Sequence, residues 1–288
     1  MTTGEPTIAV EAERPLLEVA AEAEAAGQYL PVDAAVEATT AAEAAAGTRL
    51  GPRALGYGPA RRWVVGARTR DGHELGPPEA DAGAWAGLAA DALETITWRT
   101  LAQPEATRTV IGLFLESAGA ARALATLAAE PPPSLVAAEL CDRGAGHWLV
   151  GEVLDAECVL VLRLEGETEA AARAGRAAWQ AVERAGGMPR VFEREWGRWR
   201  WRATHPTLGA RAVVARFEAP NAELPALFDA VRETGALLGE SAARAHALLG
   251  ALYGYLPTGP RLDEALTWLR SAARERDAAL EVVLPGMA

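Results

Sequence analysis

The apolar and polar positions of the first hundred residues switch between strand and helix patterns. The first predicted helix, Leu16 to Ala26, is rich in Ala and Glu. It is expected to end at Gly27, since glycine readily adopts the conformation that closes a helix. The predicted strands are Thr7 to Ala12, Trp63 to Arg70 and Thr95 to Leu101, and the predicted helices are Leu16 to Ala26 and Ala41 to Ala46. Gln103-Pro104 marks a boundary, which predicts one domain over residues 1–103 and another over residues 104–288.

The second domain is predicted to contain one unit twice. VLRLEGETEAAARAGRAAWQAV and VARFEAPNAELPALFDAV align, and each pass is close to the order β-α-β-β-α-β of a ferredoxin-like unit. The first pass has strands at Thr107 to Leu115, Ser134 to Cys141 and Cys158 to Glu165, a loop at Gly144 to Leu149, and helices at Ser117 to Ala129, capped by Ser117, and Thr168 to Ala185. The second has strands at Arg211 to Glu218, Ala236 to Glu240, Ala245 to Tyr255 and Ala279 to Leu284, and helices at Asn221 to Thr234 and Leu262 to Arg276.

The segment GPRALGYGPARR, Gly51 to Arg62, is the candidate ligand loop. Its glycines allow the backbone to approach a ligand closely, and its prolines fix the chain direction. Three arginines, Arg53, Arg61 and Arg62, could form forked hydrogen bonds with phosphate oxygens. The alternative interpretation is an ordinary structured loop with solvated arginines.

Four segments that contain or flank this loop follow one another in a characteristic order. They are VEAERPLLEVAAEAEAAGQYLPVDAA (Val10 to Ala35), ATTAAEAAAGTRLGPRALGYGPARR (Ala38 to Arg62), WVVGARTRDG (Trp63 to Gly72) and ALETITWRTLAQPEA (Ala92 to Ala106). Together they resemble the flavin-binding domain of the FAD-linked oxidases, the vanillyl-alcohol-oxidase and cresol-methylhydroxylase type. Within that family the likeness is greatest to the E-type subunit of glycolate oxidase.

The resemblance implies an α+β fold, with a truncated flavin subdomain followed by a duplicated ferredoxin-like antiparallel-sheet cap. The chain starts at the strand after the family's Gly-rich phosphate loop, so an N-terminally shortened domain is expected. FAD is the implied cofactor, and the positions that match the family's contacts are Thr40, Gly47, Arg53, Tyr57, Gly58 and, through its backbone near the adenine, Ile96. One pair of family glycines is replaced by Ala41-Ala42 or Ala42-Glu43, and another glycine by Glu94, which predicts a degenerate flavin site.

Composition narrows the class of protein. The 288 residues carry a net charge of −11, which disfavours nucleic-acid binding because that needs a basic surface. There is no basic-plus-apolar leader and no apolar run long enough to span a membrane, so a cytoplasmic protein is expected. Cys141 and Cys158 are expected to be buried free thiols. The four histidines lack metal-ligand spacing, so no metal site is predicted.

Residues 196–202 have the most unusual composition, since arginines alternate there with tryptophans. On a strand, the arginines would lie on one face and the tryptophans on the other. One interpretation is a stacking platform for an anionic ligand or single-stranded nucleic acid. The other, favoured by the acidic character of the chain, is an amphipathic strand whose tryptophans lie in the core or at a subunit interface.

The resemblance predicts a subunit of an FAD-linked oxidoreductase that acts on a 2-hydroxy acid. The implied partners are a homologous flavoprotein subunit and an iron–sulfur subunit, or further copies of this chain. The residues themselves show no convincing catalytic base, so the sequence leaves open whether the chain is an enzyme. The alternative hypothesis is a flavin-free structural subunit that pairs with a catalytic homologue.

Overall fold

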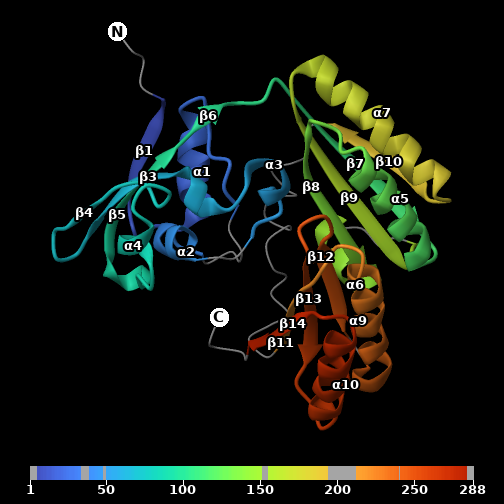
Figure 1. Cartoon of the computed structure of the whole chain (residues 1–288). Helices are drawn as coiled ribbons and strands as arrows, with labels where there is room; N and C mark the ends of the chain where they lie inside the picture. The colour runs from blue at the N-terminus through green and yellow to red at the C-terminus, as the bar shows by residue number, and fades with distance from the viewer. Residues whose placement is uncertain are drawn as a thin grey trace. The chain divides into compact units, whose positions relative to one another are not determined.

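The chain folds into two compact units, Met1–Glu105 and Ala106–Ala288 (Figure 1). The predicted boundary at Gln103-Pro104 lies just before this division. A computed structural model describes residues 5–33, 39–47, 50–150, 155–193, 212–239 and 241–283, apart from the side chains of residues 147–150 and 192–193. The segment with alternating Trp and Arg, residues 196–202, lies outside the described residues.

The first unit is a small antiparallel sheet with short helices. Its strands are β1 (Thr7–Glu11), β2 (Gln28–Tyr29), β3 (Val64–Thr69), β4 (Glu74–Leu75), β5 (Leu93–Arg99) and β6 (Leu101–Ala102). Its helices are α1 (Leu16–Ala25), α2 (Ala41–Ala46), α3 (Ala54–Tyr57), η1 (Ala60–Trp63), α4 (Ala82–Trp85) and η2 (Ala90–Ala92). The main sheet has the order β1-β5-β3-β4, and β2 pairs with β6. Trp98, Ile96 and Leu93 of the central strand β5 pack against α1 residues such as Leu16 and Val19 to form the core.

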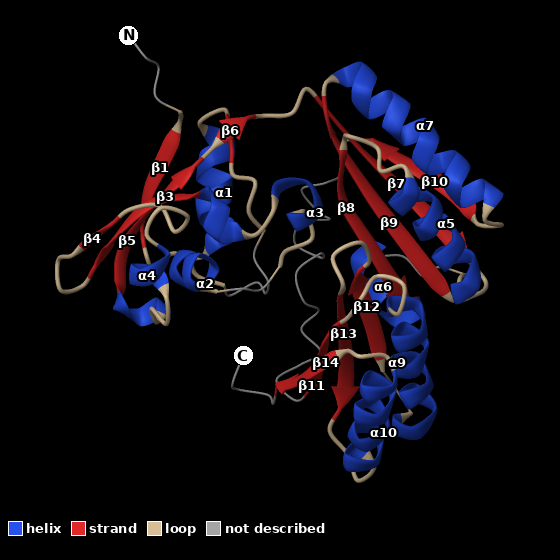
Figure 2. Cartoon of the chain, viewed as in Figure 1, coloured by secondary structure: helices blue, strands red, loops and turns tan. Residues whose placement is uncertain are grey.

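The second unit is an eight-stranded antiparallel sheet with helices on one face (Figure 2). Its strands are β7 (Ala106–Phe114), β8 (Leu135–Asp142), β9 (Cys158–Gly166), β10 (Met188–Glu193), β11 (Ala212–Glu218), β12 (Ala242–His246), β13 (Ala251–Pro257) and β14 (Ala279–Val283). Its helices are α5 (Ser117–Ala129), α6 (Arg143–Val150), α7 (Thr168–Arg184), α9 (Leu224–Leu238) and α10 (Leu262–Glu275).

The sheet consists of two four-stranded halves. The strand order is β10-β7-β9-β8-β12-β13-β11-β14, so each half places its first and third strands side by side at the centre. Helices α5 and α7 accompany the first half, and α9 and α10 accompany the second. The halves meet where β8 pairs with β12, over Cys141↔Arg244 to His246↔Glu139. The predicted mixed helix-and-sheet class is confirmed.

The two faces of this sheet differ in chemistry. Gly112 on β7 faces α7, and Gly254 on β13 faces α9, because a Cβ at either position would meet Val182 or Val231. Since side chains alternate along a strand, the neighbouring residues point to the opposite face. Strand pairing carries that assignment across the sheet, and places on the opposite face the buried polar residues Thr109, Glu139, Arg163, Arg244 and His246.

Two local predictions in the first half of this sheet are wrong, and in each case a hydrogen bond to an aspartate carboxylate explains the observed structure. Ser117 does not cap α5, since its hydroxyl donates instead to Asp229 at 2.8 Å. The predicted loop at Gly144 to Leu149 is part of α6, because the Asp142 carboxylate accepts the backbone N–H of Ala145 at 2.8 Å. The sequence pattern had no helical signal there because this stretch is short and contains two glycines.

Two predictions in the second half of the sheet are also wrong. The strand expected at Ala236 to Glu240 does not form, since α9 continues to Leu238 and closes at Gly239, whose φ is 79°. The single strand expected at Ala245 to Tyr255 is two strands, β12 and β13, joined by a turn that ends at Gly250 with φ 72°. Both errors occur where a glycine in the left-handed conformation redirects an otherwise continuous apolar segment.

The packing of α7 on β7 predicts the effect of adding one methyl group. A Cβ at Gly112 would lie 2.8 Å from Phe114 Cε2 and 2.9 Å from both methyl groups of Val182. We expect Gly112→Ala to lower the free energy of unfolding by about 1–3 kcal/mol, because the added methyl overpacks this contact. Denaturant unfolding measures the loss. Gly259→Ala is the control, since no atom lies within 4 Å of its Cβ position, and an equal loss in both variants would contradict the packing argument.

Candidate functional site

The candidate ligand loop, Gly51 to Arg62, folds back on the first unit. It forms α3 and η1, and its tightest point is Gly51, where a Cβ would lie 2.5 Å from the Cβ of Asp33. The glycine therefore admits another part of the same chain at this point. The approach brings Arg53, which precedes α3, onto the Asp33 carboxylate.

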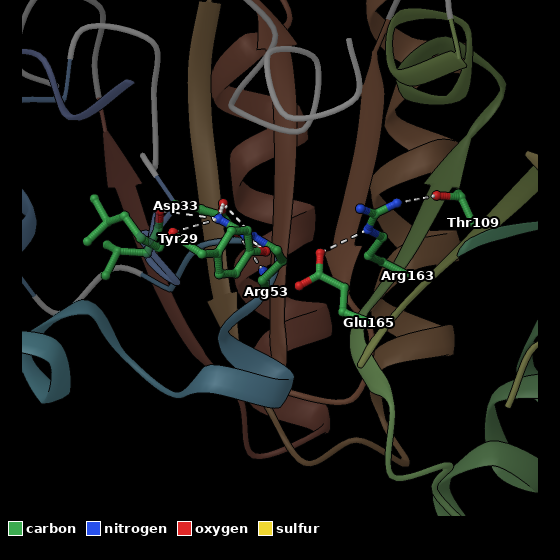
Figure 3. Close-up of polar contacts among 8 residues, drawn as sticks. Tyr29, Asp33, Arg53, Thr109, Arg163 and Glu165 are labelled. Atoms are coloured by element: carbon green, nitrogen blue, oxygen red, sulfur yellow. Dashed lines mark hydrogen bonds and ion pairs between the residues drawn. The ribbon is translucent and has the colours of Figure 1, made fainter. Parts of the chain in front are cut away.

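Arg53 is the centre of this contact (Figure 3). Its Nη2 donates to Asp33 Oδ1 at 2.6 Å, its Nε donates at 2.8 Å, and its backbone N–H donates to Oδ2 at 2.8 Å. Nη1 donates to the hydroxyl of Tyr29. The Arg53 side chain is 0% exposed and that of Asp33 is 4% exposed. This geometry is that of a buried ion pair that joins the loop to the body of the unit.

Aromatic rings surround the ion pair. The rings of Tyr29 and Tyr57 meet edge to face at 6.0 Å, and Tyr57 meets Trp63 in the same way at 6.2 Å. The Arg53 guanidinium lies 4.9 Å from the centre of the Tyr29 ring. Such contacts stabilise a cation that has left water. Tyr57, a predicted cofactor contact, thus lies within the same cluster as Arg53.

The other predicted contacts also serve the fold. Thr40 caps α2, because its hydroxyl accepts the Glu43 N–H at 3.2 Å while the Glu43 carboxylate accepts the Thr40 N–H at 2.8 Å. The N–H of Gly47 donates to the Glu43 carbonyl at 2.9 Å. Ile96 is buried in β5 between Val10 and Ala67, so its backbone groups belong to the sheet.

Gly58 and the remaining arginines lie at the end of the loop. Gly58 has φ 77° and donates its N–H to Ala54, and the side chain of Arg62 lies beside it. Arg61 is half-buried and stacks on Trp85 at 5.8 Å, whereas Arg62 is exposed. Arg62 is therefore the most accessible of the three arginines that the sequence offered for phosphate.

The second unit holds two further buried ionic clusters, on the sheet face opposite the helices. In the first, Arg163 Nε donates to Glu165 at 3.0 Å and Nη1 donates to the Thr109 hydroxyl at 3.2 Å (Figure 3). Both charged side chains are at most 3% exposed. The three residues come from neighbouring strands β7 and β9, so the sheet register alone brings them together.

The second cluster joins β8 to β12. Glu139 accepts from Arg244 Nε at 2.7 Å and lies 2.7 Å from His246 Nδ1, and all three side chains are at most 5% exposed. Burial would raise the pKa of Glu139, but the charges of His246 and Arg244 outweigh it and hold that pKa below its ordinary value. Glu139 is therefore ionised. The Tyr253 ring meets the His246 ring edge to face at 5.3 Å.

This cluster was missed by the sequence analysis. The sequence analysis stated only that the four histidines, His246 among them, lack metal-ligand spacing. The available signal was the alternation Arg244-Ala245-His246, which places two basic side chains on one face of a strand. Their partner lies 105 and 107 positions earlier, which no local pattern reveals.

Neither metal ligation nor a membrane span is indicated by the described ranges. No group of three or more His, Cys, Asp or Glu side chains there could hold a metal ion. None of the described helices is long and apolar enough to cross a membrane. Cys141 and Cys158 are buried free thiols, as predicted.

Comparison with known proteins identifies the fold. No protein-family model and no curated protein sequence matches the chain significantly. Several solved structures match it in fold. An alkyldihydroxyacetonephosphate synthase matches with a TM-score of 0.72 at 16% identity, over 96% of this chain and 59% of that one. A VAO-type flavoprotein from Myceliophthora thermophila matches with a TM-score of 0.64 at 14% identity, over 96% of this chain and 59% of that one. A chitooligosaccharide oxidase matches with a TM-score of 0.67 at 12% identity, over 96% of this chain and 69% of that one.

The chain thus has the fold of the VAO-type flavoproteins. It spans about three-fifths of the length of the synthase. At these sequence identities the comparison establishes the fold only, and an activity must be argued from the residues of the site.

Arg53, one of the predicted cofactor contacts, does not fit the diphosphate of FAD. The Arg53 guanidinium already binds the Asp33 carboxylate, and a diphosphate beside that buried anion would be repelled. The close approaches of Gly47 and Gly51 are to Glu43 and Asp33 of the chain itself. These positions therefore keep the order of the family's motif while their side chains and glycines stabilise the loop.

The Arg53–Asp33 pair predicts a large cost for removing the carboxylate. Asp33→Ala leaves a buried guanidinium without its counter-charge, so we expect the free energy of unfolding to fall by about 3–5 kcal/mol. Urea unfolding measures it. The control is Glu94→Ala, which breaks the half-exposed pair of Arg68 with Glu94 and should cost at most about 1 kcal/mol. Similar losses in the two variants would show that burial does not set the cost.

Asp142 predicts a pH dependence of stability. Burial raises its pKa from 3.8 to about 6, against the opposing effect of N–H bonds from Ala145 and Ala243. The folded state therefore holds this proton more tightly than the unfolded state. The resulting stabilisation is complete below pH 3.8 and is lost as pH rises to about 6, by about 3 kcal/mol in total.

Asp142→Asn removes this titration. Urea unfolding at several values from pH 4 to pH 7 measures the free energy of unfolding of both proteins. As the pH rises over that interval, the stability of the wild type should fall relative to that of the variant. A difference that stays constant with pH would contradict the raised pKa.

Proposed function

We propose that this chain is part of an FAD-linked oxidoreductase that acts on a 2-hydroxy acid, of the glycolate oxidase E type. The observation that carries the proposal is the match of 96% of the chain to VAO-type flavoprotein structures. The ordered motifs from Val10 to Ala106 support the narrower assignment, since they resemble that subunit. Buried ionic clusters on one sheet face support a site for a small polar substrate.

The second unit is proposed to be the substrate-binding cap. Its second half follows the order β-α-β-β-α-β of a ferredoxin-like unit, and its first half follows the same order with α6 inserted between β8 and β9, which supports a duplicated cap. Helices cover one face of the sheet, while the other carries Arg163, Glu139, Arg244 and His246. Buried charges are costly to retain, and they are found where a ligand must be bound or oriented.

The flavin is proposed to be held without Arg53. When bound, FAD would supply the hydride acceptor of the oxidation, and the chain would supply orientation of the substrate. Of the arginines in the candidate ligand loop, the exposed Arg62 is the proposed contact for phosphate. A homologous flavoprotein subunit and an iron–sulfur subunit are the proposed partners.

Spectroscopy of the purified chain tests this proposal. We expect added FAD to bind with quenching of its fluorescence, and glycolate to bleach the visible absorption band of the bound flavin under anaerobic conditions. Arg62→Gln should weaken FAD binding by about tenfold, as expected for one lost charged contact. Arg270→Gln, on the exposed face of α10, is the control. A chain that binds no FAD, alone or with its proposed partners, would refute the assignment.

A further inference from the structure

The Glu139 carboxylate organises two basic side chains for a ligand. Arg244 and His246 lie two residues apart on β12, so they share one face of the sheet, and both reach the same carboxylate on β8. Glu139 is 2% exposed and ionised, so it accepts hydrogen bonds and donates none. The cluster therefore fixes the orientation of both partners.

Arg244 has a donor that its surroundings do not use. Only Nε of its guanidinium bonds to Glu139, while Nη2 is buried and has no hydrogen-bond partner among the residues that the structure describes. The side chain is 4% exposed, so water does not readily replace the missing acceptor. Burying a charged donor without an acceptor is costly, which points to an anionic ligand at Nη2.

His246 offers the complementary group. Because the Glu139 carboxylate can only accept, the 2.7 Å contact assigns a proton to Nδ1 of the ring. A hydroxyl group can bond to Nε2 in either state of the ring, because it donates to Nε2 of the neutral ring and accepts from Nε2–H of the charged ring. The Tyr253 ring and the imidazole meet edge to face, with an angle of 72° between their planes. Glu139 thus acts as a positioning residue that selects the tautomer.

We propose that Arg244 and His246 bind a small 2-hydroxycarboxylate, with Arg244 Nη2 donating to the carboxylate and His246 Nε2 forming a hydrogen bond with the 2-hydroxyl. The hydroxy-acid part of this assignment rests on the proposed function. The rest follows from one unused cationic donor and one oriented ring nitrogen on the same strand face. Neither residue was among the predicted site residues.

Binding of glycolate and of acetate to the full chain tests the proposal, since acetate lacks only the hydroxyl. We expect Arg244→Gln to weaken both ligands by about 10–100-fold, the range for losing a charged hydrogen bond. His246→Leu should weaken glycolate by about tenfold and leave acetate unchanged. Arg270→Gln is the control, because Arg270 is an exposed arginine of α10 outside this cluster.

Nitrogen NMR of the wild-type chain is the second measurement, so that the result does not depend on a variant folding. Glycolate should shift the resonance of His246 Nε2 more than acetate does, and both should shift Arg244 Nη2. Unchanged resonances at saturating glycolate, or equal losses of both ligands in His246→Leu, would overturn the proposal. Reduction of bound flavin by glycolate together with unchanged resonances would refute this site alone, whereas binding at this site without any flavin would refute the proposed function.

Discussion

The structure depends on arginines that have left water and must find acceptors inside the protein. Arg53 finds Asp33, Arg163 finds Glu165, and Arg244 finds Glu139. Each pair is almost fully buried, so neither member can be removed without leaving a charge in a medium of low dielectric constant. In the first unit the pair is fully satisfied and stabilises a loop. In the second unit Arg244 keeps one buried donor, Nη2, without a partner among the described residues, so its pair with Glu139 is also a candidate binding group.

The fold was predictable from the sequence wherever one periodicity continues over a whole element. Ala41–Ala46 and Ser117–Ala129 were predicted with their observed bounds, because their small and apolar residues repeat at helical spacing and Thr40 caps the first of them. The errors arose where a single residue changes the direction of the backbone. Gly250 turns β12 into β13, and the carboxylate of Asp142 starts α6.

The site was less predictable, because its contacts join distant positions. The sequence suggested Arg53 as a phosphate ligand, but its partner in the structure is Asp33, which lies twenty positions earlier. The same limitation hid the cluster of Glu139, Arg244 and His246. The resemblance to the family matched Arg53 to a cofactor contact, but it could not show that the guanidinium donates its hydrogen bonds to another residue of the same chain.

The pairing of β8 with β12 is a seam between two halves that could otherwise be separate modules. It spans only Cys141↔Arg244 to His246↔Glu139, and two of its three residue pairs carry the ionic cluster. If the halves parted, they would expose a carboxylate, a guanidinium and an imidazole that now neutralise one another. Separating the halves therefore carries an electrostatic cost, which couples the opening of one half to that of the other.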